Sequence, residues 1–143
     1  MARVKIEVPE RFQFTTEIDV RVDDINYGGH LGNDALLSLL QEARVRMLAQ
    51  HGMSELDVGG AGLIMADAAV VYRSEAFRGD RLRINVGVVE MADAGCEFVY
   101  VVTNAASGKE VARAKTGMVF FDYDRRKIVR VTEKFKEALG GTR

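Results

Sequence analysis

The chain has 143 residues, of which 48% are hydrophobic and 29% are charged. This size fits one domain, residues 1–143, with one core, and the composition excludes disordered, collagen-like and coiled-coil proteins. Lys and Arg number 20 against 21 for Asp and Glu, which gives a net charge of -1. Such a balance provides no general attraction to nucleic acid or to an anionic membrane surface, so neither is expected as a partner.

The single cysteine, Cys96, can form no internal disulfide and has no partner ligands for a zinc site. The N-terminus alternates charged and apolar residues, unlike the continuous apolar stretch of a signal peptide. The longest weakly polar stretch, Gly59 to Tyr72, is interrupted by Asp67 and is shorter than the roughly 20 residues that a membrane span needs. We therefore expect a cytoplasmic protein without a membrane span.

The first strong pattern is a period-two alternation over residues 12–22, which is typical of a long strand with one face on the core. Its even positions are all apolar or threonine, and the same series leads on to Asp24 and Asn26. If these two polar groups point inward, they need hydrogen bonds, water or a ligand. The alternative is that the strand ends at residue 22 and that an Asx-type turn leads to Gly28.

A long helix is predicted to follow the glycine-rich segment that contains Gly28, Gly29 and Gly32. Asn33 and Asp34 can supply its N-cap and a first-turn acid, and its end is expected near His51-Gly52. Apolar residues recur between these points at spacings of three and four, so the sheet should bury the helix. Free N–H groups at the start of such a helix can bind a carbonyl oxygen that becomes negative, and glycine permits the close approach. Alternatively, the glycines only allow a tight turn between the predicted strand and the helix.

Four β-rich segments follow the helix, separated by short turns that contain glycine. They lie near residues 63–74, 81–91, 96–105 and 110–122. Antiparallel hairpins are the simplest way to join strands through such short turns. We therefore expect an α+β domain in which a roughly five-stranded antiparallel sheet wraps one long helix, with a short terminal helix over residues 132–139.

The segment from Asp24 to Asn33, which reads DINYGGHLGN, and the helical sequence Glu42-Ala43-Arg44 resemble the hotdog-fold thioesterases, in the branch of 4-hydroxybenzoyl-CoA thioesterase. Residues 71–73 and 79–82 resemble the family's later strand-turn-strand passage, in which a proline is common where this chain has Glu75. The resemblance covers residues 12–122 and implies a hotdog fold, with hydrolysis of an acyl-CoA or acyl-carrier thioester. It also implies dimers or tetramers whose sites lie between subunits, and neither a metal nor a redox cofactor.

The family's usual catalytic aspartate falls on Asn26 in this chain. An amide cannot be a nucleophile or a general base at neutral pH, so Asn26 is expected to hold a water or the thioester carbonyl by hydrogen bonds. The base must then be another residue. Asp24 is the first candidate and Asp67 the second, although Asp67 can equally be a structural acid. Glu42 is the third, although it can simply pair with Arg46 on the helix.

His30 is a candidate base or a donor to the carbonyl, because imidazole changes its charge near neutral pH; its alternative role is a structural hydrogen bond. The resemblance places His30 in the active site and assigns the oxyanion to the amides near Gly29 and His30. Cys96 has no histidine close in sequence and is expected to be a buried, inert thiol. The substrate-binding residues are then Tyr27, Gly28, Gly29 and Asn33.

The phosphates of acyl-CoA require cations, and two clusters could supply them or be merely solvated. One cluster comprises Arg73, Arg78, Arg81 and Arg83, and the other comprises Arg125, Arg126 and Lys127.

Two rival functions remain open. A hotdog hydratase or dehydratase has a signature that resembles Asp-x-Asn-Pro-x-His, and Asp24-Ile25-Asn26 begins that pattern. However, Tyr27 replaces the proline, and His30 comes one residue late. A non-catalytic acyl-CoA-binding module is the other rival, because Asn26 replaces the family's acid.

Overall fold

Helix α1, Asn33–Gln50, follows the glycine-rich segment directly in the computed structural model, which describes residues 3–140. Gly32 is the N-cap, in an extended conformation (φ -71°, ψ 149°), so the cap lies one residue before the expected Asn33. The helix ends as predicted, with His51 as the C-cap and Gly52 at a φ of +72°. Its buried residues recur at intervals of three and four and are Leu36, Leu39, Leu40, Ala43, Arg44, Met47 and Leu48.

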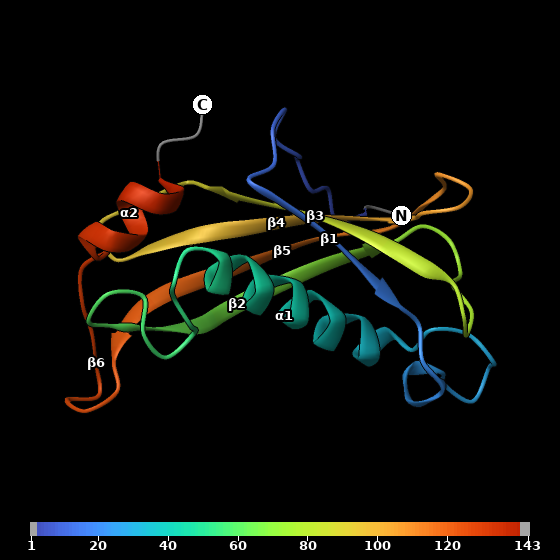
Figure 1. The fold of residues 1–143 in the computed structure, drawn as a ribbon, viewed down its shortest axis with the longest axis horizontal. Helices are drawn as coiled ribbons and strands as arrows, with labels where there is room; N and C mark the ends of the chain where they lie inside the picture. The colour runs from blue at the N-terminus through green and yellow to red at the C-terminus, as the bar shows by residue number, and fades with distance from the viewer. Residues whose placement is uncertain (1–2, 141–143) are drawn as a thin grey trace.

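The strands form one antiparallel sheet in the order β1-β3-β4-β5-β2, and β6 pairs with β5 (Figure 1). Their bounds are β1, Phe14–Asp19; β2, Gly62–Tyr72; β3, Arg81–Val89; β4, Gly95–Asn104; β5, Glu110–Asp122; and β6, Lys127–Ile128. A second helix, α2 (Glu133–Leu139), begins after Thr132, whose hydroxyl accepts the N–H of Phe135. The α+β organisation and the terminal helix are confirmed, and the two-residue β6 is an addition to the five expected strands.

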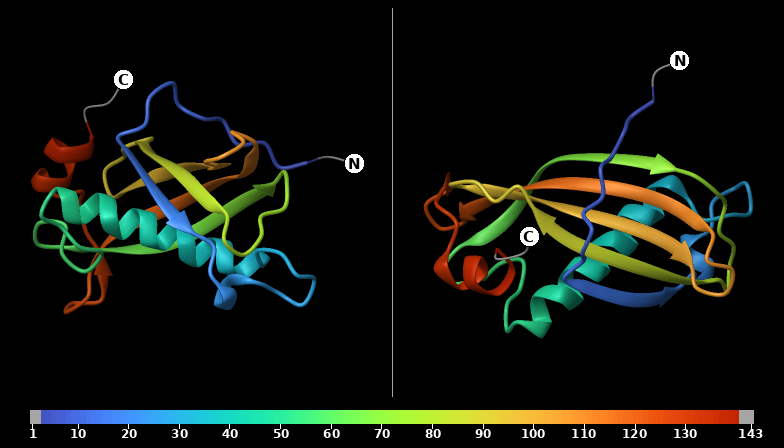
Figure 2. Two further views of the ribbon diagram at one scale, coloured as in Figure 1. Left: turned by 45° about the vertical axis from the view of Figure 1, so that its right-hand side comes forward. Right: turned by 90° about the horizontal axis from the view of Figure 1, so that it is seen from above.

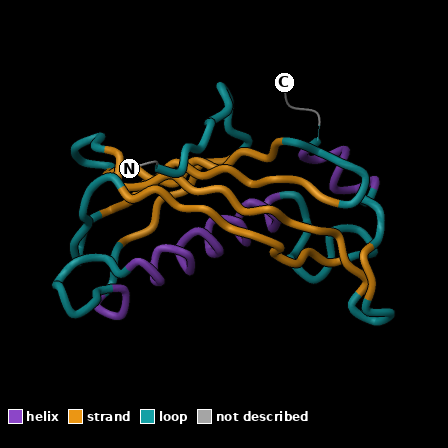
Figure 3. The backbone as a smooth tube through the Cα atoms, turned by 180° about the vertical axis from the view of Figure 1, so that it is seen from behind, coloured by secondary structure: helices purple, strands orange, loops and turns teal. Residues whose placement is uncertain are grey.

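The sheet curves around α1, which lies along one of its faces (Figures 1 and 3). The core between them contains the inward side chains of β3, β4 and β5, among them Ile84, Phe98, Tyr100 and Phe120, which are fully buried. The ring of Phe135 from α2 closes one end of this core against Phe120, with the two ring centroids 5.0 Å apart.

The first strand is shorter than the alternation predicted. β1 ends at Asp19, and residues Val22–Asp24 form a 3-10 turn, η1, in which Val22 is exposed to solvent. The inward series of apolar side chains therefore stops at Val20, and the buried Asp24 belongs to the 3-10 turn. The end of β1 is set by its pairing with β3, because the last paired residues of the two strands are Asp19 and Arg81.

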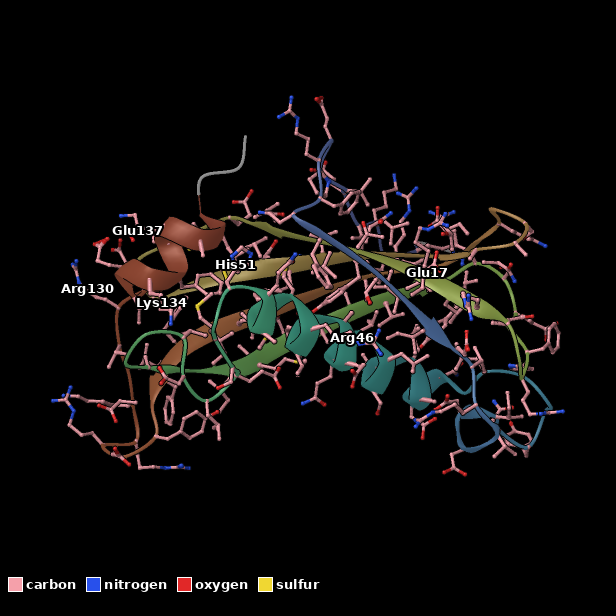
Figure 4. The ribbon with its side chains drawn as sticks, in the orientation of Figure 1. Glu17, Arg46, His51, Arg130, Lys134 and Glu137 are labelled. Atoms are coloured by element: carbon pink, nitrogen blue, oxygen red, sulfur yellow. The ribbon has the colours of Figure 1, made fainter. Side chains whose placement is uncertain are left out.

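Cross-strand ion pairs join β1 to β3 on the solvent side. Arg81 contacts Asp19 at 2.8 Å and Arg83 contacts Glu17 at 2.9 Å. Arg46 of α1 also reaches β1, where its guanidinium donates to the Glu17 carbonyl at 3.0 Å (Figure 4). These contacts bind the edge of the sheet to the helix.

The face of the sheet that does not contact α1 is crossed by the N-terminal segment (Figure 2). Ile6 of this segment is buried, and a side chain at Gly87 would meet the ring of Pro9 at 3.1 Å. Within residues 3–140, no helix has the length and apolar character to cross a membrane.

Candidate active site

Asn26 organises the turn between η1 and α1. Its side-chain Oδ1 accepts the N–H of Gly28 at 2.9 Å, and its backbone carbonyl accepts the N–H of Gly29 at 3.1 Å. Its own N–H donates to the His30 carbonyl at 2.9 Å. The Asx-type turn considered for this segment is therefore present. The Asn26 amide uses Oδ1 for the Gly28 N–H, so Nδ2 remains as its donor. No residue between 3 and 140 accepts a hydrogen bond from Nδ2.

Gly28 is the point at which the side chains of Asn26 and His30 meet. A Cβ at Gly28 would lie 3.2 Å from His30 Nε2 and 3.3 Å from Asn26 Oδ1. Gly29 is different, since its φ is +82° and the space beside it is open. Gly28 therefore provides room for the side chains of Asn26 and His30, whereas Gly29 provides a left-handed backbone. The neighbouring Tyr27 is fully exposed and lies outside this arrangement.

A pocket of about 250 Å³ opens beside this turn, at the N-terminus of α1. Its walls are residues 30–33 with Leu36 on one side and residues 72–76 with Val111 on the other. The apolar walls can hold an acyl group, and the turn and helix end provide polar atoms. The pocket therefore joins two segments that are about 40 residues apart in the sequence.

The first turn of α1 has free backbone donors, and one of them belongs to Asn33, which lines this pocket. None of the residues that the structure describes accepts a hydrogen bond from the backbone N–H of Asn33 or Asp34, as is usual at a helix start without a side-chain cap. The positive end of the helix dipole lies at the same place. The Gly29 amide is not such a donor, because the Asn26 carbonyl already accepts it.

The His30 imidazole faces the pocket through one defined nitrogen. Its Nδ1 lies 3.1 Å from the Leu31 carbonyl oxygen, which can only accept a hydrogen bond, so Nδ1 carries a proton. In the neutral ring, Nε2 then has the lone pair. This atom lies 3.6 Å from Oε2 of Glu75, a residue of the opposite pocket wall. Nε2 thus faces the Glu75 carboxylate, and in the neutral ring it is the nitrogen that can accept a hydrogen bond.

Tyr72 contacts the first residue of α1 from the opposite wall of the pocket. Its hydroxyl donates to the Asn33 carbonyl at 2.9 Å, across the pocket mouth. Burial and, after it, the negative charge of Asp34 raise the pKa of Tyr72, so the hydroxyl stays protonated and remains a donor. Sequence reasoning did not identify Tyr72 or Glu75 as site residues. The one signal was that Glu75 stands where the resembling family has proline.

Asp24 is buried but does not line the pocket. Its carboxylate accepts the backbone N–H of Arg21 at 2.8 Å and lies 3.4 Å from the Arg21 guanidinium. Its backbone carbonyl accepts the N–H of Gly32 at 2.9 Å. These contacts close the η1 turn and account for the buried charge, which indicates a structural role.

Asp67 lies on the wrong face of the sheet to reach the pocket. It pairs with Gly117 in register, beside a β-bulge in β2, and its Oδ1 accepts the Gly117 N–H at 3.0 Å. Paired residues share a sheet face, and Gly117 alternates with the inward-facing Thr116 and Met118. Asp67 is therefore an exposed carboxylate on the face opposite α1, and its structural interpretation fits the geometry.

The remaining candidates are explained by local contacts. Glu42 pairs with Arg46 at 2.8 Å, and Cys96 is buried in β4. Burial and, secondarily, the charge of Glu97 raise the pKa of the Cys96 thiol to about 12, which makes it inert near neutral pH. Within residues 3–140, no group of three or more His, Cys, Asp or Glu side chains could hold a metal ion.

Only one arginine of the first cationic cluster lines the pocket. Arg73 contacts Glu110 at 3.0 Å, and Arg113 contacts the same carboxylate at 2.7 Å. Arg81 and Arg83 belong to the ion pairs with β1 described above.

Comparison with known proteins agrees with this architecture. The family model of the thioesterase-like superfamily matches residues 20–139. A 1,4-dihydroxy-2-naphthoyl-CoA thioesterase from Synechocystis is similar in structure, with 24% identity, a TM-score of 0.82, and coverage of 90% of this chain and 96% of that one. No curated protein sequence gives a match.

Two further solved structures are similar. A DHNA-CoA thioesterase from Staphylococcus aureus has 19% identity and a TM-score of 0.78, over 87% of this chain and 86% of that one. A mutant 4-hydroxybenzoyl-CoA thioesterase, complexed with 4-hydroxybenzoyl-CoA, has 18% identity and a TM-score of 0.78, over 87% and 96%. At these identities the solved structures establish the hotdog fold, and the family match establishes the family. The chain belongs to the thioesterase-like superfamily and has the hotdog fold.

Proposed function

We propose that this protein is an acyl-CoA thioesterase, which uses water to hydrolyse the thioester of an acyl-CoA or an acyl carrier. One observation carries the proposal: a single pocket joins Nε2 of His30 to the free amide of Asn33 at the start of α1. A thioester carbonyl that develops negative charge requires such donors, and the attacking water requires such a base. The family membership agrees with this chemistry.

The proposed reaction begins with His30. Neutral Nε2 takes a proton from water as the water oxygen attacks the thioester carbon, and Glu75 stabilises the imidazolium. The N–H group of Asn33, which lines the pocket, holds the oxyanion. Nδ2 of Asn26, from the turn beside the pocket, donates to the carbonyl or to the water. When the intermediate collapses, the C–S bond breaks, and the CoA thiolate takes the proton back from His30. The products are a carboxylic acid and CoA.

His30 replaces Asp24 and Asp67 as the proposed base, because His30 lines the pocket and neither aspartate does. The acid limb of the pH–rate profile tests this assignment. Substitution His30→Asn should abolish the limb, since it removes the titrating nitrogen but keeps a polar side chain. Asp24→Asn and Asp67→Asn should retain it. If either aspartate variant loses the limb while His30→Asn keeps it, the assignment is wrong.

Thiol release from a panel of acyl-CoAs tests the activity itself. Release of CoA with turnover supports hydrolysis, and its loss in His30→Ala links the activity to the pocket. An absorbance change of an enoyl-CoA without thiol release would instead indicate a hydratase. Binding of acyl-CoA with neither signal would indicate the non-catalytic module that Asn26 allows.

We also propose that the active form is a homodimer joined along β2. This strand is an edge of the sheet, and its middle, residues 64–68, is exposed. Ile64 and Met65 are 39% and 41% exposed, which is unusual for large apolar side chains on a strand with an unpaired edge. A second copy that pairs with β2 satisfies the free backbone groups and covers these side chains.

A further inference from the structure

We infer that Tyr72 is a positioning residue of the proposed reaction: its hydroxyl holds the first turn of α1, and with it the oxyanion-binding N–H of Asn33, at a fixed place in the pocket wall. This role deepens the proposed function and rests on it, because Asn33 supplies the donor in that reaction. Tyr72 itself contacts the helix start and takes no proton in the proposed steps, so its effect on the substrate passes through the helix.

The first turn of α1 lacks the side-chain cap that commonly holds a helix start. Its N-cap is Gly32, which has no side chain to accept an N–H of the turn. The carboxylate of Asp34 accepts the N–H of the next residue, Ala35, at 2.9 Å, which is the third N–H of the helix and not the first. The Asn33 N–H therefore stays free for a ligand, but the turn that contains it lacks a usual source of stability.

The orientation of the Asn33 N–H depends on whether this first turn is formed. The N–H and the Gly32 carbonyl belong to one planar peptide group. That carbonyl accepts the N–H of Leu36 at 3.1 Å, which is the first hydrogen bond of the helix. When the turn frays, this bond breaks and the peptide group can rotate, so the donor leaves its place in the pocket wall.

Tyr72 restrains the turn from the opposite wall of the pocket. Its hydroxyl donates to the Asn33 carbonyl at 2.9 Å, which belongs to the peptide group that follows the donor. Tyr72 is the last residue of β2 and pairs in register with Ala112 of β5, which is fully buried, so its ring projects from a fixed strand. A second link between the same walls runs from the Leu31 N–H to the Ala76 carbonyl at 2.8 Å. The start of α1 is thus held on both sides of its N-cap.

The first experiment compares two tyrosines whose hydroxyls each donate to a backbone carbonyl. In Tyr72→Phe, kcat should fall about tenfold or more with KM unchanged, because the misplaced donor binds an oxyanion that forms only during the reaction. Tyr72 is 42% exposed, so the fold should remain intact. Tyr123 donates to the Leu63 carbonyl at 2.8 Å, and neither residue lines the pocket, so Tyr123→Phe should keep the wild-type kcat. An unchanged kcat in Tyr72→Phe, or a raised KM alone, overturns the inference.

A double-mutant cycle shows whether Tyr72 acts through the Asn33 N–H. Asn33→Pro removes this N–H and retains the helix, because proline is favoured at the first helical position and Gly32 already has the extended conformation that a following proline requires. This variant alone should lose roughly a hundredfold in kcat. Adding Tyr72→Phe should cause no further loss, since the donor that Tyr72 positions is already absent. A further loss of about tenfold in the double variant overturns the positioning role.

Amide hydrogen exchange measures the restraint without any substrate. The Leu36 N–H exchanges when the first turn opens, so its exchange should be about five- to tenfold faster in Tyr72→Phe than in the wild type, as expected for the loss of one hydrogen bond. In Tyr123→Phe it should not change. The N–H of Ala43, in the middle of α1, should exchange at the same rate in all three proteins and is the internal reference. Equal Leu36 exchange in Tyr72→Phe and in the wild type overturns the inference.

The role of Tyr72 and the thioesterase activity fail in distinguishable ways. If no acyl-CoA is hydrolysed, the proposed function fails, and the exchange of the Leu36 N–H still decides whether Tyr72 holds the helix start. If thioesters are hydrolysed and Asn33→Pro lowers kcat while Tyr72→Phe does not, the thioesterase proposal stands and the positioning role fails.

Discussion

At the scale of single residues, Asn26 is the departure with the largest chemical consequence. Its Oδ1 is occupied by the Gly28 N–H, and its Nδ2 is the only part of the side chain left for a substrate. An aspartate in this geometry would accept the same N–H with one oxygen and present a second carboxylate oxygen in place of Nδ2. The turn can therefore accommodate either residue, and the choice between them changes the chemistry and not the fold.

We predict that Asn26→Ala lowers turnover by about tenfold to a thousandfold, because it removes a donor to the carbonyl or water. Asn26→Asp should retain or raise turnover, since it restores the family's carboxylate without disturbing the turn. Steady-state kinetics with one acyl-CoA, together with thermal melting as a folding control, measure both. If the wild type is inactive and Asn26→Asp creates activity, the binding-module interpretation replaces the thioesterase proposal.

The adjacent glycines allow a matched comparison. In Gly28→Ala, the new methyl group lies 3.2 Å from His30 Nε2, so turnover should fall about tenfold or more while stability changes little. In Gly29→Ala, the space is open but φ is +82°, so the free energy of unfolding should fall by about 1–2 kcal/mol with turnover of the folded protein retained. Equal losses of turnover in the two variants would contradict the separate roles.

At the scale of elements, the bulge in β2 explains Asp67. The β2–β5 register shifts at this point, and the Asp67 carboxylate accepts the Gly117 N–H in place of a backbone carbonyl. An acid in an apolar strand therefore serves the strand itself. The bulge turns the Asp67 side chain to the sheet face opposite α1, and the carboxylate is therefore far from the helix.

Two substitutions at this position should separate structure from catalysis. Asp67→Asn keeps an oxygen for the Gly117 N–H and should leave turnover near that of the wild type. Asp67→Ala leaves that N–H without its acceptor and should lower the free energy of unfolding by about 1 kcal/mol, measured by urea titration. A large loss of turnover in a folded Asp67→Asn protein would return Asp67 to the active site.

Strand β4 contains a buried group with a clear dependence on pH. The pKa of the Cys96 thiol is raised to about 12 in the folded protein and is about 8.5 in an unfolded chain. The neutral thiol therefore contributes its full stability below about pH 8.5, and that contribution is lost as the pH rises toward 12. Between these values the free energy of unfolding should fall by up to about 1.4 kcal/mol per pH unit.

Urea titrations of the wild type and Cys96→Ala at several pH values isolate this effect, since all other titrating groups are shared. The difference in unfolding free energy between the two proteins should narrow as the pH rises from 8.5 to 10.5. Parallel pH profiles would show that the thiol does not titrate in this way.

At the scale of the whole molecule, β2 is an edge strand whose outer backbone groups have no partner strand among the described residues of one chain. We predict a dimer at micromolar concentration, measured by light scattering. Met65→Lys should yield a monomer with low activity, because it replaces an exposed apolar side chain of the β2 edge with a charge that the paired strands would have to desolvate. Val22→Lys, at an exposed apolar residue outside β2, is the matched control and should remain dimeric. An active, strictly monomeric wild type would refute the assembly.

Local signals account for most of the elements. The apolar spacing and the glycine at its end located α1 to within a residue, because helix periodicity and capping depend on neighbours in sequence. The turns between β3, β4 and β5 were likewise visible in the glycine positions. The end of β1 was misplaced, since the alternation continues to Val22 although β3 provides no partner beyond Arg81.

By itself, the sequence determined the α+β class and the family resemblance, and it predicted the candidate site at the start of α1. Only the tertiary structure decided which acid accompanies His30, because Glu75 is 45 residues away and reaches it through the return of β2 to the helix start. It also separated Asp24 and Asp67 from the pocket, through a local ion pair and a bulge that no periodicity reveals. Motifs depend on residues that are adjacent in the chain, whereas the proposed base His30 and Glu75 are brought together by sheet pairing, which depends on long-range contacts.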